Sequence, residues 1–118
     1  MVFGEDLGMD TETCAQIATA FGGGIAHLGL TCGAVTGALM VMGRMHGGFG
    51  EKKQATYLLV EEFVKRFKDI HGSISCTELI GYDLGDPDQL AEARAKGLIA
   101  EKCAGYVKTA VKLLEHLL

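Results

Sequence analysis

Residues 31–48 read TCGAVTGALMVMGRMHGG, and this stretch predicts the helix around which the rest of the chain packs. We expect the helix to begin after Thr31, which acts as its cap, and to end at Gly47-Gly48. Gly33 and Gly37 stand four residues apart, and small residues at that spacing let another backbone approach closely. The helix, and Gly37 in particular, is therefore expected at the centre of a bundle.

The rest of the chain also has helical periodicity, without the sustained alternation of apolar and polar residues that indicates strands. A helix is expected after Asp10, ending at the triple glycine 22–24, with an inward face that carries Cys14. Further helices are expected at residues 51–70, from the capping box at Ser75, from Asp86 to about Gly97, and over the remaining residues. The prediction is an all-α protein, a compact small bundle of about four to six helices in a single domain over residues 1–118.

Composition and charge narrow the range of functions. With 118 residues, of which 48% are apolar and 22% charged, the chain has the size of one globular domain. A formal net charge of −4, without a run of lysines or arginines, argues against a nucleic-acid partner, which requires a clustered basic face.

The acidic amino terminus lacks the features of a secretory signal, so we expect a cytoplasmic protein. The apolar stretch 24–43 is broken by glycines, so we expect no membrane span. A redox partner protein and a homo-oligomer both stay open.

Four cysteines are the most informative residues of so short a chain. They are Cys14, Cys32, Cys76 and Cys103, and no two of them form a CxxC pair. In a reducing cytoplasm such residues are more often thiols, metal ligands or catalytic groups than permanent disulfides. The sequence therefore points to sulfur chemistry.

Cys32 and Cys76 are the candidates for reactive thiolates. Each follows a predicted cap, Thr31 or Ser75, so each is expected in the first turn of a helix. The unpaired N–H groups and the partial positive charge of a first turn favour thiolate over thiol, which lowers the pKa of a cysteine that is also reachable. A thiolate can attack a disulfide, react with an oxidant or bind a metal.

Cys14 and Cys103 lie on apolar helix faces, where packing alone explains a cysteine. Four cysteines on separate helices can nevertheless converge if the bundle brings these faces together. Four thiolates at one point suit zinc or an iron–sulfur cluster, and close pairs suit a reversible disulfide. The candidate catalytic residues are Cys32, Cys76, Cys103 and Cys14, and in an alternative interpretation Cys32, Cys76 and Cys103 are metal ligands.

The histidines carry weaker predictions. His27 is close in sequence to Cys32 and could orient its thiolate or accept its proton, although a loop histidine in water is the simpler interpretation. His71 and His116 lie near predicted helix carboxyl ends, where a positive imidazolium suits the helix dipole. No lysine follows the triple glycine in P-loop register, so nucleotide binding is not expected.

Several segments together resemble one protein family. They are Phe21-Gly22-Gly23-Gly24-Ile25, the run from Cys32 to Met40, the run from Gly72 to Leu79, and Cys103. These segments span most of the chain and resemble the C_GCAxxG_C_C family. The resemblance implies a small helical protein with reactive or metal-binding cysteines, described as redox-active and similar to the iron–sulfur part of split-Soret cytochromes.

Two departures from the family pattern bear on the cysteines. The family label places glycine before cysteine, whereas here Cys32 precedes Gly33. Family members also carry an earlier helix with a Cys-Ala-x-x-Val type of segment, and this chain is expected to begin near the end of that helix. Cys14-Ala15-Gln16-Ile17 is either the counterpart of that segment or a coincidence, so the site holds either four thiols or three.

The predicted function is redox chemistry, in which clustered cysteines carry out thiol–disulfide exchange or electron transfer. One alternative is a metal or iron–sulfur cluster binding protein without turnover. Its cofactor would be an iron–sulfur cluster or a transition metal, which the sequence does not identify. A second alternative is a structural helical interaction module. Nothing in the sequence requires a conventional enzyme.

Overall fold

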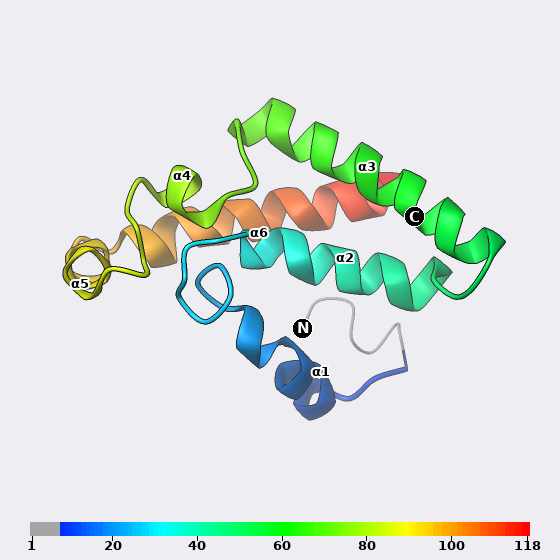
Figure 1. Cartoon of the computed structure of the whole chain (residues 1–118), viewed down its shortest axis with the longest axis horizontal. Coiled ribbons are helices and arrows are strands. Elements are labelled where there is room, and N and C mark those ends of the chain that lie inside the picture. The colour runs from blue at the N-terminus through cyan, green and yellow to red at the C-terminus, as the bar shows by residue number, and fades with distance from the viewer. Residues whose placement is uncertain (1–7) are drawn as a thin grey trace.

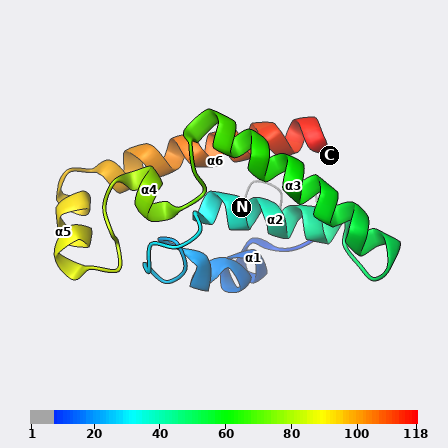
Figure 2. The same ribbon diagram turned by 45° about the horizontal axis from the view of Figure 1, so that its top comes forward.

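Three long helices form the body of the protein in a computed structural model that describes residues 8–118. They are α2 (Gly33–His46), α3 (Glu51–His71) and α6 (Leu98–Leu117), and each packs against the other two (Figure 1). Turned by 45°, the molecule shows α3 crossing over α2 with α6 alongside (Figure 2). The described residues contain no strand, only an isolated bridge between Thr31 and Ser75, so the predicted all-α class is confirmed.

Three shorter helices complete the fold. α1 (Thr11–Ala18) runs into a short 3-10 helix (Thr19–Phe21), and α4 (Cys76–Ile80) and α5 (Pro87–Ala95) fill the segment between α3 and α6. Both α4 and α5 pack against α6. No helix within residues 8–118 combines the length and the apolar character needed to cross a bilayer.

Three of the helices begin at side-chain caps that the sequence predicts. In each, a side-chain oxygen accepts a hydrogen bond from a backbone N–H of the first turn, which satisfies a donor that has no partner inside the helix. The caps are Asp10 for α1, Ser75 for α4 and Asp86 for α5, with N···O distances of 2.7, 3.4 and 2.9 Å.

The start of α2 differs from the prediction by one residue. Its N-cap is Cys32, whose side chain makes no capping hydrogen bond, and not Thr31. Thr31 instead pairs with Ser75 in the isolated bridge. This pairing keeps the backbone at Thr31 extended, so α2 begins only at Gly33. Cys32 therefore lies just before the first turn of α2 and not inside it.

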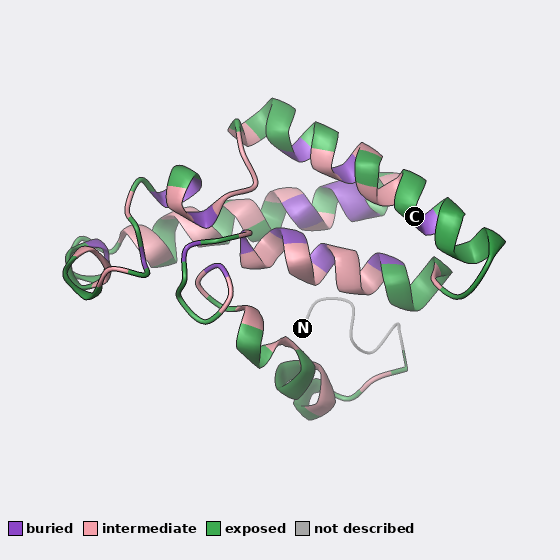
Figure 3. Ribbon diagram, viewed as in Figure 1, coloured by how far each residue is buried: buried purple, intermediate pink, exposed green. Residues whose placement is uncertain are grey.

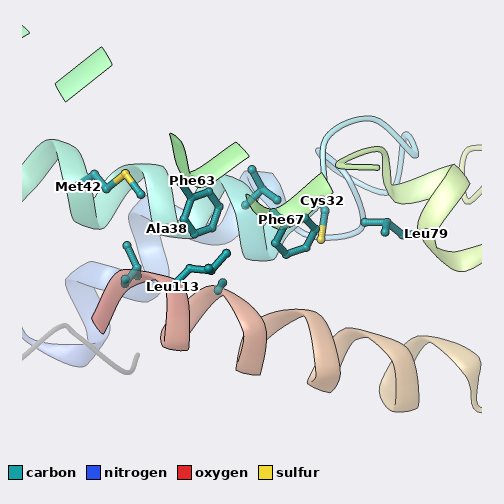
Figure 4. Packing of buried hydrophobic residues seen from close by; sticks show 10 residues of the cluster. Cys32, Ala38, Met42, Phe63, Phe67, Leu79 and Leu113 are labelled. Carbon is teal, nitrogen blue, oxygen red and sulfur yellow. The ribbon is translucent and has the colours of Figure 1, made fainter. Parts of the chain in front are cut away.

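The main core lies between the three long helices (Figure 4). Phe63 and Phe67 of α3 are fully buried, with ring centroids 6.1 Å apart. Burial of side chains of this size contributes about 1.5–3 kcal/mol each relative to exposure. The first core, as we call it, consists of Cys32, Val35, Ala38, Met42, Phe63, Phe67, Leu79, Ala110, Leu113 and Leu114.

A second core lies where α4 and α5 meet the amino-terminal half of α6. Cys103 of α6 packs against it from one side. Tyr106, one turn further along α6, packs against both cores and therefore marks the boundary between them. The buried members of the second core are Cys76, Ile80, Leu84 and Ala93.

α1 contributes no residue to either core, and its predicted inward face is only partly buried, at Cys14 and Ala18 (Figure 3). None of its residues is buried, and Ile17 leaves 52% of its surface exposed. In both ribbon views α1 lies on the side of α2 that faces away from α3 and α6. Its apolar residues therefore have no core within reach.

Gly37 lies on an open face of α2 and not at a close helix contact. A Cβ atom added to it would meet no atom of the described residues within 4 Å. The prediction that Gly37 admits a second backbone is wrong, because α3 and α6 pack against the face of α2 that carries Val35, Ala38 and Met42.

Replacing Gly37 by alanine should therefore stabilise the protein by roughly 0.5–1 kcal/mol, because alanine has less conformational entropy to lose in a helix. Urea denaturation of Gly37→Ala measures the change in the free energy of unfolding. Gly105→Ala in α6 is a matched control, since a Cβ at that position also meets nothing within 4 Å. A destabilised Gly37→Ala beside a stabilised Gly105→Ala would show that another backbone does approach α2.

Candidate functional site

Three of the four cysteines come together where the two cores meet. Cys32 caps α2, Cys76 is the first residue of α4, and both are buried. Cys103 lies in the second turn of α6 and is partly buried. We call Cys32, Cys76 and Cys103 the thiol cluster.

A short backbone ladder brings Cys32 to Cys76. On either side of the isolated bridge, the Cys32 N–H donates to the Ile74 carbonyl at 2.7 Å and the Cys76 N–H donates to the Leu30 carbonyl at 2.6 Å. Side chains alternate between the two faces of such a ladder, so the two cysteines project from the same face. In a regular ladder they are diagonal neighbours, and such residues lie about 7 Å apart. A disulfide requires the two Cβ atoms to lie roughly 4 Å apart. The cysteines are free, and a disulfide between these two requires the ladder to shift.

Burial and mutual proximity set the protonation of the thiol cluster. Burial, and after it the charges of Cys32 and Cys103, raise the pKa of Cys76 from 9.0 to about 11. Burial and Cys32 also raise the pKa of Cys103. The thiols of Cys76 and Cys103 are therefore protonated at neutral pH, and Cys32 lies close enough to both to raise their pKa values.

The prediction that a helix start lowers the pKa of Cys76 is wrong, although its position is as expected. Ser75 caps α4 and Cys76 occupies the first turn. However, α4 has only five residues, so its dipole is small, and only 5% of the Cys76 surface is exposed. Burial disfavours the charged thiolate, and here it outweighs the charge at the helix end.

Tyr106 belongs to the site, although the sequence pattern did not single it out. It lies one turn from Cys103 on the same face of α6, and its hydroxyl donates to the Leu79 carbonyl at 2.7 Å. Burial raises the pKa of Tyr106, and all three cysteines of the thiol cluster, Cys103 foremost, raise it further. From the sequence, a tyrosine on an apolar helix face is interpreted as a packing residue. The signal that could have found it is the need of a buried tyrosine hydroxyl for a partner.

His71 also lies nearer to the site than its place in the sequence suggests. Its ring meets that of Tyr106 edge-on, with centroids 4.9 Å apart, and lies 4.9 Å from that of Phe67. Its Nε2 atom is 2.8 Å from Thr109 Oγ1. The histidine is indeed in the last turn of α3, as predicted, but it also packs behind Tyr106.

The glycine loop before α2 packs closely against Cys76. Gly24 is buried, and a Cβ added to it would lie 2.6 Å from the Cys76 Cβ and 2.7 Å from the Leu30 nitrogen. Residues 23–27 form a left-handed run, with φ between 49° and 72°. Three of these residues are not glycine, and each of them costs roughly 1–2 kcal/mol in this conformation. The loop therefore adopts a costly conformation that lets its backbone touch Cys76.

His27 lies within this left-handed run and away from the thiol cluster. Its side chain is exposed, and its Nε2 atom is 3.5 Å from Arg94 Nη2. The interpretation of His27 as a loop histidine fits this position, whereas a role in accepting the proton of Cys32 has no geometric support.

Cys14 is not brought to the thiol cluster. It is partly buried in α1, and this helix lies on the other side of α2 from α6 (Figure 1). It is also not among the groups that raise the pKa of Cys76 or Cys103. The structure thus gathers three of the four predicted cysteines, and a catalytic role for Cys14 stays a prediction.

No metal site is preformed in the described part of the chain, so the interpretation of the thiol cluster as metal ligands stays a prediction. Within residues 8–118, no group of three or more histidine, cysteine, aspartate or glutamate side chains is disposed to hold a metal. A metal needs deprotonated thiols that converge on one point. The interpretation of Cys32, Cys76 and Cys103 as metal ligands therefore requires these side chains to rearrange.

Comparison with protein families gives a match over nearly the whole chain. The model of a family described as "Putative redox-active protein (C_GCAxxG_C_C)" matches residues 1–117. It is the family that the sequence segments resemble. No curated protein and no solved structure matches the chain significantly.

Gly24→Ala should destabilise the fold by about 3 kcal/mol or more, because a methyl group there adds a backbone clash to the cost of a left-handed residue. Urea denaturation checks the change. Gly72→Ala is the control: that residue is also left-handed, but nothing lies within 4 Å of an added Cβ, so the loss should be only about 1–2 kcal/mol. Equal losses in the two variants would mean that the loop does not press on Cys76.

Above pH 9 the buried Cys76 should lower the stability of the fold. The unfolded thiol ionises near its ordinary pKa of 9.0, whereas the folded one keeps its proton to about 11, so the folded state binds more protons between these values. This contribution is fully present below pH 9 and is lost as the pH rises to about 11. We expect a loss of about 1–2 kcal/mol in the free energy of unfolding, after allowing for solvent screening.

Urea denaturation of the wild type and of Cys76→Ala at both ends of this pH range isolates the effect. The variant has no thiol at this position to ionise, so its stability should fall less than that of the wild type. A loss of the same size in both proteins would contradict the burial of Cys76.

Proposed function

This chain belongs to the C_GCAxxG_C_C family, and we propose that its thiol cluster carries out thiol–disulfide exchange. The observation that carries the proposal is the convergence of Cys32, Cys76 and Cys103 from three separate helices on the boundary between the two cores. Packing explains a single buried cysteine, but it gives no reason for three thiols to gather at one place.

The reaction needs a disulfide as the oxidant, in a small molecule or in a partner protein. Cys103, the most accessible of the three, loses its proton to solvent, and its thiolate attacks one sulfur of that disulfide. A mixed disulfide forms and one substrate thiolate leaves. A second thiolate, from Cys76 or Cys32, then attacks the Cys103 sulfur and displaces the other substrate thiolate. The cluster ends as a disulfide that has given up two electrons, and the substrate ends as two thiols that have taken up two protons.

The same geometry implies that the cluster reacts slowly unless it opens. With a pKa of about 11, roughly one Cys76 thiol in ten thousand is ionised at neutral pH. Only 5% of the Cys76 surface is exposed, which also hinders its attack on a mixed disulfide at Cys103. A movement of α4 that exposes Cys76 to water lowers its pKa toward the ordinary value and also frees the thiol to attack the Cys103 sulfur.

Oxidation with glutathione disulfide, followed by peptide mapping, tests the proposal. We expect two thiols of the cluster to be lost as one intramolecular disulfide, while Cys14 stays open to alkylation. Cys14→Ala should oxidise at the wild-type rate, whereas Cys103→Ala should lose most of the reaction, because it lacks the attacking thiol. If all four wild-type thiols stay free under oxidising conditions, thiol–disulfide exchange is wrong.

The control for this experiment is the metal content of protein prepared without oxygen. We expect a colourless, folded and metal-free sample, because no group of three or more ligating side chains within residues 8–118 is disposed to hold a metal. A stoichiometric metal that is lost on replacing Cys32, Cys76 or Cys103 would favour metal binding over exchange.

A further inference from the structure

α4, the short helix that carries Cys76, is tied to the glycine loop at its amino end. The Cys76 N–H donates to the Leu30 carbonyl at 2.6 Å. The Thr77 hydroxyl donates to the Gly29 carbonyl at 2.8 Å, and the Thr77 N–H donates to the same carbonyl at 3.3 Å. The first of these bonds belongs to the ladder described above, and the two Thr77 bonds add to it from within α4.

The carboxyl end of α4 is tied to α6 by two side chains that lie four residues apart. The Tyr106 hydroxyl donates to the Leu79 carbonyl at 2.7 Å, and the Lys102 amine donates to the Ile80 carbonyl at 3.3 Å. The last carbonyls of a helix have no hydrogen-bond donor inside the helix, and these two bonds supply donors for two of them. Residue 103, the third cysteine of the thiol cluster, lies between these two side chains in the sequence.

A helix of five residues is not stable on its own, because it has too few internal hydrogen bonds to offset the cost of starting a helix. The position of Cys76 therefore depends on the burial of Leu79 and Ile80 in the two cores and on the ties at the two ends of α4. If either tie breaks, Cys76 can leave the thiol cluster while the three long helices stay packed.

Tyr106 is the firmer of the two ties at the carboxyl end. Its bond is shorter than that of Lys102, 2.7 Å against 3.3 Å, and its ring is held between the two cores and the edge of His71. A lysine amine, by contrast, ends a flexible chain and is strongly hydrated. Tyr106 also touches the cluster that it helps to close, since Cys103 lies one turn before it on α6.

We propose that Tyr106 is a positioning residue, whose hydrogen bond to Leu79 keeps α4 closed, and that release of this bond is the step that lets Cys76 react. The inference rests on the proposed function in that it takes Cys76 for a working thiol. In the closed form Cys76 is buried and protonated. Once α4 opens, the thiol returns to water, and its ionised fraction at a given pH rises about a hundredfold as its pKa falls from about 11 toward 9.0.

The rate at which iodoacetamide alkylates Cys76 in the whole chain measures this opening. The thiolate displaces iodide and forms a carbon–sulfur bond, and the proton goes to the buffer, so no oxidant is involved. Tyr106→Phe keeps the ring and removes only the hydroxyl. We expect Cys76 to react about five- to tenfold faster in the variant, the effect of losing one buried hydrogen bond, while the rate at Cys14 stays the same. An unchanged rate at Cys76 would overturn the inference.

Thr109→Val is the matched control. It removes a hydroxyl from the next turn of α6, where the group bonds to Gly105 and lies beside His71 but does not touch α4. We expect the rate at Cys76 to stay at the wild-type value. An equal acceleration by Thr109→Val and Tyr106→Phe would mean that any weakening of α6 exposes Cys76, and Tyr106 would have no special role.

The dependence on urea separates positioning from a general loss of stability. Opening of α4 exposes its own buried side chains but leaves the contacts among the three long helices in place. Alkylation of Cys76 in Tyr106→Phe should therefore depend on urea less steeply than global unfolding does, and it should exceed that of Cys32. If Cys32 and Cys76 accelerate together with a steep dependence on urea, the residue is merely structural. Should Tyr106→Phe fail to fold, Lys102→Met tests the other tie. It should produce a smaller acceleration at Cys76, and no acceleration would overturn the inference.

This experiment can fail independently of the proposed function. Faster alkylation in Tyr106→Phe without any disulfide in the oxidised wild type would uphold the positioning role and refute thiol–disulfide exchange. A disulfide in the wild type, with the same alkylation rate in both proteins, would uphold exchange and refute the positioning role.

Discussion

The antiparallel bridge between Thr31 and Ser75 is the constraint on which the rest of the structure depends. It fixes the start of α2 against the start of α4, although 44 residues separate them, and so joins the first core to the second. It also explains why Thr31 does not cap α2, since its backbone is engaged elsewhere. Two of the three residues of the thiol cluster, Cys32 and Cys76, are brought together by this pairing, because the residue after each bridge partner is a cysteine.

Those features of the fold that depend on neighbours in the sequence could be predicted. Helical periodicity and capping side chains act within one turn, so α3, α4 and α5 begin where the sequence places them. The close contact at Gly37 was predicted wrongly, and the predicted inward face of α1 is buried only in part, for a common reason. Each required knowledge of which helix lies opposite, and that is decided by the packing of α2 against α3 and α6.

The same distinction between local sequence features and long-range packing applies to the candidate site. Cysteine composition and helix positions were enough to propose Cys32, Cys76 and Cys103 together, but not to separate Cys14 from them. The direction of the Cys76 pKa was predicted wrongly because it is a balance between burial, a property of the whole fold, and a local helix end. Tyr106 was overlooked because its hydrogen bond joins residues 27 apart, and a pattern of apolar spacing contains no information about a hydroxyl.

The left-handed run at residues 23–27 has a consequence for the integrity of the chain. It stores conformational strain, and Ala26, His27 and Leu28 are exposed at its outer edge. Once this segment detaches, its residues relax to ordinary right-handed or extended geometry, so the strain favours detachment over repacking. Proteases cut where an exposed segment readily becomes extended. Limited digestion of the folded protein would thus begin at this loop and would release a fragment containing α1 from a remnant that retains both cores.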